Sequence, residues 1–382
     1  MASTPSLYFG NGKVTLLPSL LKDNRTVMLV TGASSFSASP QGKEVTAQLE
    51  AGFKLQHVII DREPSPEMID RAVANSSQGL PDVVVAIGGG SVVDAGKAIS
   101  AMLTIREPVK NYLEGVGINP AHPGTKIPFI AIPTTSGTGS EATKNAVLSE
   151  VGPTGYKKSL RHNNFVPNIA LVDPELTLGC PARITGTSGM DAFTQLLESY
   201  LSTSANSITD ALALEGLRRI ASSLLKVCKQ GDDLEARSDM AFAAYLSGVT
   251  LANAGLGLVH GFASSIGGLL NIPHGVICSA LMPSANRTTV LKLRRLKNEA
   301  ALARYAAVGK LFSREEKKTD EYYVDFLLTA VAGLAHEINI PSLREYGFTT
   351  QHHKKIIDTT DNKNNPVVLD PDEMLEVLEN AL

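Results

Sequence analysis

The first half of the chain alternates short apolar runs with longer stretches in which apolar and polar residues mix. Short runs rich in β-branched residues are typical of strands buried on both faces of a parallel sheet. These predicted strands span residues 25–31, 56–61, 83–87, 127–132 and 168–173, and two intervening segments, 41–51 and 66–77, have helical character. Because helix-length segments separate the strands, we expect βαβ units and a Rossmann-like α/β domain with a mostly parallel sheet.

The pattern changes in the second half of the chain. From about residue 184 onward apolar residues recur at helical spacing, most clearly over residues 208–229, 234–254 and 292–312. We therefore predict two domains: an α/β domain over residues 1–178 and an all-α domain over residues 179–382.

Composition narrows the classes of partner. The chain is 43% hydrophobic and 19% charged with a net charge of −3, which gives no reason to expect nucleic acid or an anionic membrane surface. The N-terminus lacks a signal-peptide pattern, and no apolar run approaches the roughly 20 residues of a membrane helix. Cys180, Cys228 and Cys278 are scattered and odd in number, which argues against a disulfide framework and favours the cytoplasm. We interpret each cysteine as a small buried apolar residue.

A glycine turn follows the predicted strand at residues 83–87. Gly88–Gly90 are followed by Ser91 and Asp94, whose spacing resembles a capping box and predicts a helix start there. A strand, a glycine turn and a helix N-terminus together form a cradle for an anion, most often a phosphate. An ordinary βα turn before a capped helix explains this stretch equally well.

A second glycine-rich segment, residues 132–143, also follows a predicted strand. Its hydroxyl side chains are suited to phosphate or ribose oxygens: Thr134, Thr135, Ser136, Thr138 and Ser140. Taken alone, the segment also fits a loop that leads into a helix. Because ligands bind beyond the carboxyl ends of parallel strands, two such loops favour a nucleotide. Neither loop is a Walker A motif, and the first departs from G-x-G-x-x-G at its last position.

The helical half contains a third group of candidate residues. Asp191 and Gln195 stand four apart and so share one face of a predicted helix, and His260 and His274 flank a glycine-containing apolar segment. One carboxylate and two imidazoles are suitable ligands for Fe²⁺ or Zn²⁺. The alternatives are that Asp191 caps its own helix together with Ser188 and that both histidines are structural.

Taken together, these motifs resemble the iron-containing (group III) alcohol dehydrogenase family, which shares its fold with glycerol dehydrogenases and dehydroquinate synthases. The resemblance begins at Tyr8, ends at Asn364-Asn-Pro, and passes through GGGSVVDAGKAI, IPTTSGTGSEAT, NIALVDPELT, GMDAFTQLLESYLS and the block at residues 260–274. It implies an NAD- or NADP-dependent oxidoreductase with one divalent metal, Fe²⁺ or Zn²⁺. The implied reaction is hydride transfer between the cofactor and a small primary alcohol or aldehyde, in a homodimer or larger homo-oligomer.

The resemblance also implies site residues. The GGGS turn would hold the cofactor pyrophosphate, and the hydroxyl-rich loop would contact the cofactor as well. The implied cofactor-binding residues are Gly89, Gly90, Ser91, Asp94, Thr134, Thr135, Thr138, Ser140, Asn145 and Lys158. The family's metal ligands, one Asp and three His, correspond to Asp191, Gln195, His260 and His274.

The chain departs from the family pattern at two positions of the metal region. Gln195 replaces a histidine and would ligate through its carbonyl oxygen, more weakly than an imidazole. Ser264 replaces a further histidine to which a catalytic role is sometimes given, so no catalytic residue is assigned. Glycerol dehydrogenases resemble this chain in using one Asp and two His. The alternatives are a metal-independent enzyme similar to maleylacetate reductase, a lyase similar to dehydroquinate synthase, and a cofactor-binding protein without activity.

A further departure concerns the choice between NAD and NADP. Many relatives carry, after the first long strand, an Asp that would repel the 2′-phosphate of NADP. This chain has Thr31-Gly32-Ala33-Ser34 there, with no acidic residue. We therefore expect Gly32 to admit NADP and Ser34 or Ser35 to hydrogen-bond its 2′-phosphate.

Overall fold

The chain forms two compact units. The computed structural model describes residues 3–33, 35–76, 79–119 and 121–382. The α/β unit contains Met1–Glu150 and Lys157–Cys180, and the helical unit contains Val151–Tyr156 and Pro181–Leu382. The chain therefore enters the helical unit briefly at residues 151–156, returns, and leaves the α/β unit after Cys180.

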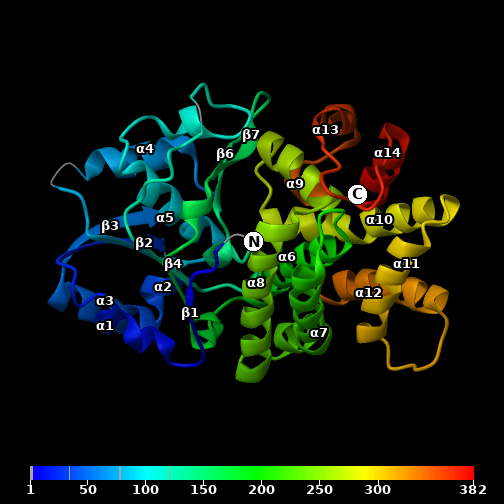
Figure 1. Ribbon diagram of the computed structural model, residues 1–382, viewed down its shortest axis with the longest axis horizontal. Helices are drawn as coiled ribbons and strands as arrows, with labels where there is room; N and C mark the ends of the chain where they lie inside the picture. Colours follow the sequence, from blue (N-terminus) through cyan, green and yellow to red (C-terminus); the bar gives the residue numbers. More distant parts are fainter. Residues whose placement is uncertain (1–2, 34, 77–78, 120) are drawn as a thin grey trace. The chain divides into compact units, whose positions relative to one another are not determined.

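A six-stranded sheet forms the centre of the α/β unit, with strand order β1-β8-β5-β4-β2-β3 and parallel pairing throughout (Figure 1). The strands are β1 (Ser6–Phe9), β2 (Thr26–Gly32), β3 (Lys54–Ile60), β4 (Val83–Gly88), β5 (Phe129–Pro133) and β8 (Ile169–Val172). All residues of β4 and β5 are buried, which explains why their sequences are apolar without alternation. The predicted strands are therefore confirmed within about two residues, and the short β1 is an addition.

Helices cover both faces of this sheet. They are α1 (Leu17–Leu20), α2 (Ser35–Ala38), α3 (Pro40–Gly52), α4 (Pro66–Asn75) and α5 (Gly90–Met102). Leu17 and Leu49 pack in one cluster with Val27 and Val85, so α1 and α3 cover the face to which these strand residues point. The helices predicted at residues 41–51 and 66–77 correspond to α3 and α4, although residue 77 lies outside the described residues.

Helix α5 lies directly on the opposite face of the sheet. A Cβ atom on Gly96 would come within 2.6 Å of the Ala86 Cβ on β4 and 2.9 Å of the Phe129 ring on β5. Glycine therefore permits this close approach. Every residue from Ala95 to Met102 is buried. The start of α5, which carries the glycine turn, is consequently held firmly at the end of β4.

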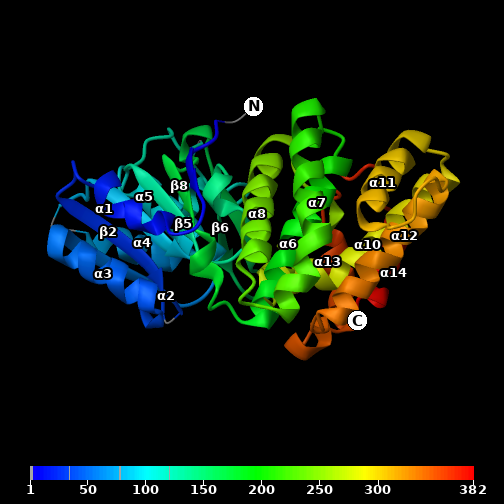
Figure 2. The same ribbon diagram turned by 90° about the horizontal axis from the view of Figure 1, so that it is seen from below.

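The helical unit is built around a long buried helix. Its helices are α6 (Ala182–Leu201), α7 (Ser207–Lys229), α8 (Leu234–Ala254), α9 (Leu258–Leu269), α10 (His274–Arg295), α11 (Glu299–Phe312), α12 (Asp320–Glu337), α13 (His353–Thr359) and α14 (Pro371–Asn380). Helix α6 packs against α7, α8 and α10 (Figure 2). The predicted fold class, an α/β region with a parallel sheet followed by an all-α region, is confirmed.

No single helix among the described residues is long and apolar enough to cross a bilayer. Only α8 and α9 taken together, bent by 97° at their junction, reach that length and composition.

One local prediction is wrong, and one small sheet was not predicted. The helix predicted at residues 292–312 is broken, because α10 ends at Arg295, Lys297 adopts a φ of 53° and Asn298 begins α11 by accepting a hydrogen bond from the Ala301 amide. Apolar spacing continues across this break and so concealed it. A two-stranded sheet, β6 (Asn145–Glu150) and β7 (Tyr156–Arg161), was not predicted, because polar residues interrupt its strands and neither forms a continuous apolar run.

Candidate functional site

The glycine turn leaves the start of α5 without a side-chain cap. Helix α5 begins at Gly90, its N-cap residue is Gly89, and no described side chain caps it. The capping box predicted from Ser91 and Asp94 is therefore wrong. Uncapped amides at a helix N-terminus, together with the helix dipole, favour an anion in front of them.

Asp94 instead ties α5 to the second loop. One of its carboxylate oxygens accepts a hydrogen bond from the Ser140 hydroxyl, and the other accepts one from the Val147 amide at 3.2 Å. Both carboxylate oxygens are engaged within the protein. Asp94 thus has a structural role in the loop arrangement, and its direct contact with a cofactor stays a prediction.

The two predicted cofactor loops lie side by side. The Thr134 amide donates to the Gly88 carbonyl at 2.9 Å, and a Cβ atom on Gly90 would lie 2.6 Å from Thr138 Oγ1. Only a residue without a side chain fits where the turn passes Thr138. The structure therefore brings together six of the predicted cofactor-binding residues at the carboxyl ends of β4 and β5: Gly89, Gly90, Ser91, Thr134, Thr135 and Thr138.

These loops stand next to the point where the strand order reverses. The chain runs from β2 outward to β3, returns to β4 on the other side of β2, and continues through β5 to β8. Ligands of open parallel sheets bind at such a switch point. Gly32 ends β2 there, and a Cβ atom on it would lie 3.8 Å from the Val92 side chain. Ser35 begins α2, and Ser34 lies outside the described residues.

Lys97 holds the second loop in place through hydrogen bonds to residues 140–145. It was not predicted as a functional residue. Its ammonium group donates to the Ser140 carbonyl and the Thr143 hydroxyl at 2.7 Å and to the Asn145 carbonyl at 2.8 Å. Burial lowers the pKa of Lys97 to about 8, although the nearby Asp94 carboxylate opposes the fall. A lone lysine within the apolar stretch of α5 was the available signal.

The remaining predicted cofactor residues are placed differently. Ser140 is 3% exposed, and its hydroxyl is held by Asp94 and Lys97. Asn145 begins β6 next to this network, whereas Lys158 is an exposed residue of β7. Cofactor contact by these three residues stays a prediction.

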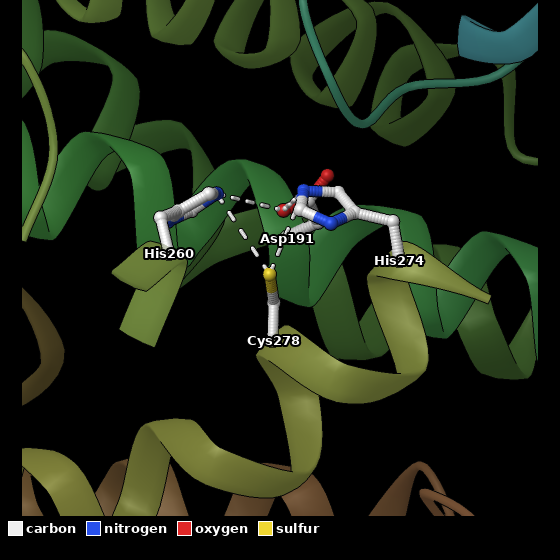
Figure 3. Close-up of side chains that lie close together, drawn as sticks. All are labelled: Asp191, His260, His274 and Cys278. Atoms are coloured by element: carbon white, nitrogen blue, oxygen red, sulfur yellow. Dashed lines mark hydrogen bonds and ion pairs between the residues drawn. The ribbon is translucent and has the colours of Figure 1, made fainter. Parts of the chain in front are cut away.

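The helical unit contains a separate cluster of metal-type donors. Asp191 comes from α6, His260 from α9, and His274 and Cys278 from the first turns of α10 (Figure 3). One potential ligand atom from each residue lies within 4.8 Å of the others. Because Asp191 lies in the interior of α6, the alternative that it caps its own helix is wrong.

The donor atoms face one another at short range. Asp191 Oδ1 lies 3.5 Å from His260 Nε2 and 3.6 Å from His274 Nε2, and Cys278 Sγ lies 3.7 Å from each of these nitrogens (Figure 3). Asp191 is 1% exposed, and its Oδ1 has no hydrogen-bond partner among the described residues. A buried carboxylate oxygen without a donor is costly, and a cation between these groups would remove that cost. The donor set therefore fits an ion such as Zn²⁺ or Fe²⁺.

The charge of Asp191 is favourable for a cation. Burial alone would raise the pKa of this carboxyl, but the imidazoles of His274 and His260 outweigh burial and lower the pKa to about 2. The carboxylate is therefore ionised throughout the neutral range.

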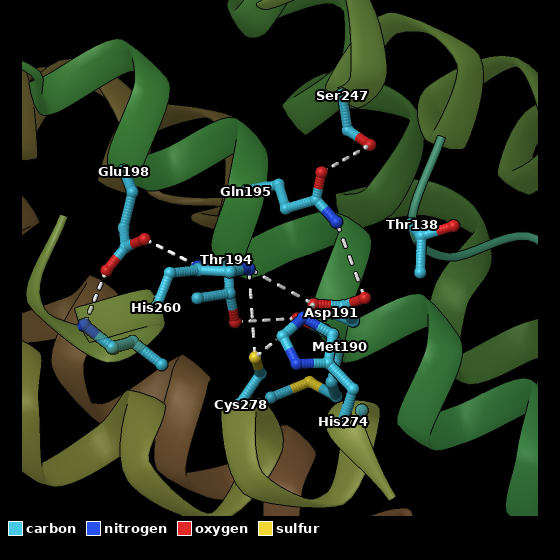
Figure 4. Close-up of polar contacts among 12 residues, drawn as sticks. Thr138, Met190, Asp191, Thr194, Gln195, Glu198, Ser247, His260, His274 and Cys278 are labelled. Atoms are coloured by element: carbon cyan, nitrogen blue, oxygen red, sulfur yellow. Dashed lines mark hydrogen bonds and ion pairs between the residues drawn. The ribbon is translucent and has the colours of Figure 1, made fainter. Parts of the chain in front are cut away.

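Glu198 orients His260 through Nδ1, the ring nitrogen that does not face the donor cluster. Its Oε2 lies 2.7 Å from His260 Nδ1 (Figure 4). Its Oε1 accepts a hydrogen bond from the Val259 amide at 2.7 Å. The contact with Nδ1 holds the ring so that Nε2 faces the donor cluster. With its proton on Nδ1, the imidazole would offer the Nε2 lone pair to a cation bound there. Glu198 was not predicted, although it follows Asp191 by two helical turns within the same motif.

Gln195 lies beside Asp191 but is turned away from the other donors. Its amide nitrogen donates to Asp191 Oδ2 at 3.4 Å, and its amide oxygen accepts a hydrogen bond from Ser247 at 3.5 Å (Figure 4). The predicted shared helix face is therefore confirmed, whereas metal ligation by Gln195 stays a prediction. Ser264 donates its hydroxyl to the His260 carbonyl at 2.9 Å.

Cys278 was expected to be a small buried apolar residue. It is fully buried, but its sulfur belongs to the donor cluster. Its position four residues after His274, on the same face of a helix, was the signal that could have placed it there.

Loops suited to a nucleotide and a buried donor cluster define the chain as a candidate oxidoreductase that uses a nucleotide cofactor and a metal. Residues 4–174 match the family model "Iron-containing alcohol dehydrogenase", and residues 185–382 match "Fe-containing alcohol dehydrogenase family, C-terminal". The chain belongs to the iron-containing alcohol dehydrogenase family. It is therefore an oxidoreductase that acts on CH–OH groups, in a family that uses NAD(H) and a divalent metal.

Individual relatives agree with this assignment. The chain is 30% identical to alcohol dehydrogenase 4 of Saccharomyces cerevisiae (strain YJM789), over 99% of this chain and 97% of that protein. It is 32% identical to the NADPH-dependent butanol dehydrogenase of Clostridium saccharobutylicum, over 98% and 95% of the two chains. A crystal structure of 1,3-propanediol oxidoreductase superposes with a TM-score of 0.88 at 28% identity, covering 100% of this chain and 99% of the other.

Proposed function

We propose that this protein is a metal-dependent, NAD(P)-linked alcohol dehydrogenase for a small primary alcohol. The balanced reaction converts alcohol and NAD(P)⁺ to aldehyde, NAD(P)H and a proton, and it is reversible. The observation that carries the proposal is the buried Asp191 Oδ1, which accepts no hydrogen bond within the described part of the chain and faces two imidazoles and a thiol.

The α/β unit is proposed to bind the nicotinamide dinucleotide. The uncapped amides at the start of α5 are suited to the pyrophosphate, and the hydroxyls of Thr134, Thr135 and Thr138 are suited to its oxygens and to ribose. Lys97 and Asp94 hold the second loop in place for this contact. The absence of an acid after Thr31 in the sequence supports use of NADP, and the related butanol dehydrogenase is named as NADPH-dependent.

The helical unit is proposed to hold the metal through Asp191, His260 and His274. When bound, the ion supplies a Lewis acid for the substrate oxygen. Asp191 contributes a permanent negative charge to the site, and Glu198 keeps the His260 lone pair directed toward it. The His274 side chain is 24% exposed, whereas Asp191 and His260 are almost completely buried. Solvent or substrate would therefore reach the ion beside His274. Ser264 is hydrogen-bonded to the backbone and has no basic group with which to accept the substrate proton.

The relatives support a small alcohol or aldehyde as substrate, since one is named for butanol and one for 1,3-propanediol. The cytoplasmic location and the homo-oligomeric state stay predictions.

The proposal is tested by metal analysis of the purified protein and by NAD(P)H oxidation against a panel of short-chain aldehydes, with and without a chelator. We expect turnover that the chelator abolishes and that added Zn²⁺ or Fe²⁺ restores. Turnover that resists chelation would instead support the metal-independent reductase. Cofactor binding without any turnover would support a family member that has lost activity.

A further inference from the structure

We propose that Cys278 is a metal ligand, so that this chain holds its ion in an Asp–His–His–Cys site, and that Gln195 positions Asp191 without ligating. This inference rests on the metal dependence proposed above. It concerns the fourth ligand of the ion. The family pattern supplies this ligand as a histidine at residue 195, where this chain has glutamine.

The distances fit a tetrahedral site with one sulfur. An ion about 2.0–2.1 Å from nitrogen and oxygen and about 2.3 Å from sulfur separates its ligands by about 3.3 Å for N···O and about 3.5 Å for N···S. The observed N···O distances are 3.5 and 3.6 Å, and both N···S distances are 3.7 Å. In these four of the six donor pairs a contraction of a few tenths of an ångström reaches the tetrahedral values, and the two remaining pairs also lie within 4.8 Å.

The surroundings of Cys278 distinguish it from a cysteine that merely fills space. Its sulfur is fully buried and approaches the Nε2 atoms of both histidines. The same two nitrogens approach Asp191 Oδ1, the buried oxygen without a hydrogen-bond partner among the described residues. The unpartnered carboxylate oxygen and the sulfur thus face the same pair of imidazoles from different helices, which is the arrangement a shared ion requires.

Charge balance also favours sulfur over an amide as the fourth donor. A thiolate and the Asp191 carboxylate place two negative charges among the ligands themselves, matching a divalent ion, whereas with a neutral amide as fourth donor the ligands carry only one. Binding of the ion displaces the thiol proton to solvent, so the charges balance.

Gln195 acts on the other side of Asp191. Its amide nitrogen contacts Oδ2, the carboxylate oxygen directed away from the histidines, and its amide oxygen contacts Ser247. These contacts orient the carboxylate so that Oδ1 faces the other donors. A sulfur ligand, together with the general order of affinities, favours Zn²⁺ over Fe²⁺ in this chain.

The test uses the full-length protein, stripped with a chelator and loaded with Co²⁺ alone. We expect one Co²⁺ per chain and a near-ultraviolet sulfur-to-cobalt charge-transfer band. Cys278→Ser should lose the band and bind Co²⁺ at least about tenfold more weakly. Gln195→Ala should keep the band, and Cys228→Ser, a cysteine on α7 outside the cluster, should keep both band and affinity.

The outcomes separate this inference from the proposed function. Stoichiometric Co²⁺ binding without the band, or a band that survives Cys278→Ser, would overturn sulfur ligation and leave metal dependence standing. Failure of the wild-type protein to bind Co²⁺ or Zn²⁺ would overturn both. If Cys278→Ser does not fold, X-ray absorption of the wild-type Zn²⁺ form decides the matter. A sulfur scatterer at about 2.3 Å supports the inference, and a shell of nitrogen and oxygen alone overturns it.

Discussion

The cofactor loops and the metal centre are built in opposite ways. The loops consist of contiguous segments in which backbone amides, glycines and small hydroxyl residues form the binding surface. The proposed metal centre consists of four side chains from three helices, spread from residue 191 to residue 278. A site made of backbone amides depends on one continuous segment of sequence. A site made of side chains can take a donor from a different helix when one position lacks it. Changes in the two regions should therefore have separable effects.

The largest effect is expected from Asp191→Asn. The substitution preserves size but removes the negative charge that faces both imidazoles, so metal affinity should fall by more than about 100-fold and turnover should be lost. Metal content and steady-state kinetics measure this loss. NADPH binding, followed by fluorescence, serves as the control and should be unchanged. A variant that retains its metal would show that the ion binds elsewhere.

Glu198→Gln should have the next largest effect. A carboxylate accepts hydrogen bonds from both the Val259 amide and His260 Nδ1, whereas the single oxygen of glutamine satisfies only one of these donors. We expect metal affinity, measured by competition with a chelating dye, to fall by about 10–100-fold. An unchanged affinity would mean that Glu198 does not orient the histidine.

Gly90→Ala changes the cofactor loops instead of the metal cluster. The new Cβ would lie 2.6 Å from Thr138 Oγ1 and force the two loops apart, so NAD(P)H affinity should fall by about tenfold, or about 1.4 kcal/mol, with metal content unchanged. Gly52→Ala is the matched control, because a Cβ atom there has no described neighbour within 4 Å. Wild-type cofactor affinity in Gly90→Ala would exclude this turn from the binding site.

Lys97 is expected to change the stability of the fold, rather than the affinity for metal or cofactor, as the pH changes. Its pKa falls from 10.5 to about 8 on folding, so between these values the unfolded chain binds more protons and stability contributed by this group rises with pH. The wild-type protein should gain stability relative to Lys97→Met from pH 8 to 10.5, by at most about 1.4 kcal/mol per pH unit. Denaturant unfolding of both proteins across this range measures the difference. A constant difference would show that Lys97 is not buried as a titrating group.

Features of the fold that depend on residues close in sequence could be predicted. Strands β2 and β4 are continuous apolar runs because both faces of the sheet are covered, and the loops after β4 and β5 consist of residues that are close in sequence. The break after Arg295 was missed because apolar spacing continues across it, although the chain reverses at Lys297.

The candidate site could be predicted only in part, because its organisation depends on contacts between distant residues. Glu198 and His260 are 62 residues apart in sequence, and Asp94 and Ser140 are 46 apart. Local spacing suggested that Asp94 caps a helix, and only the packing of α5 against the second loop shows its real partner. Cys278 was interpreted from its residue type alone. Its spacing of four from His274 indicated a contact with that histidine, but nothing in the sequence showed that His260 would face it as well.

The most direct test of the proposed metal-dependent dehydrogenase is a Zn²⁺ titration of the chelator-treated protein during NADPH oxidation with a short-chain aldehyde. We expect negligible turnover without zinc, a linear rise as zinc is added, and a plateau at one ion per chain. Full turnover before any zinc is added, with no further increase, would contradict the proposal.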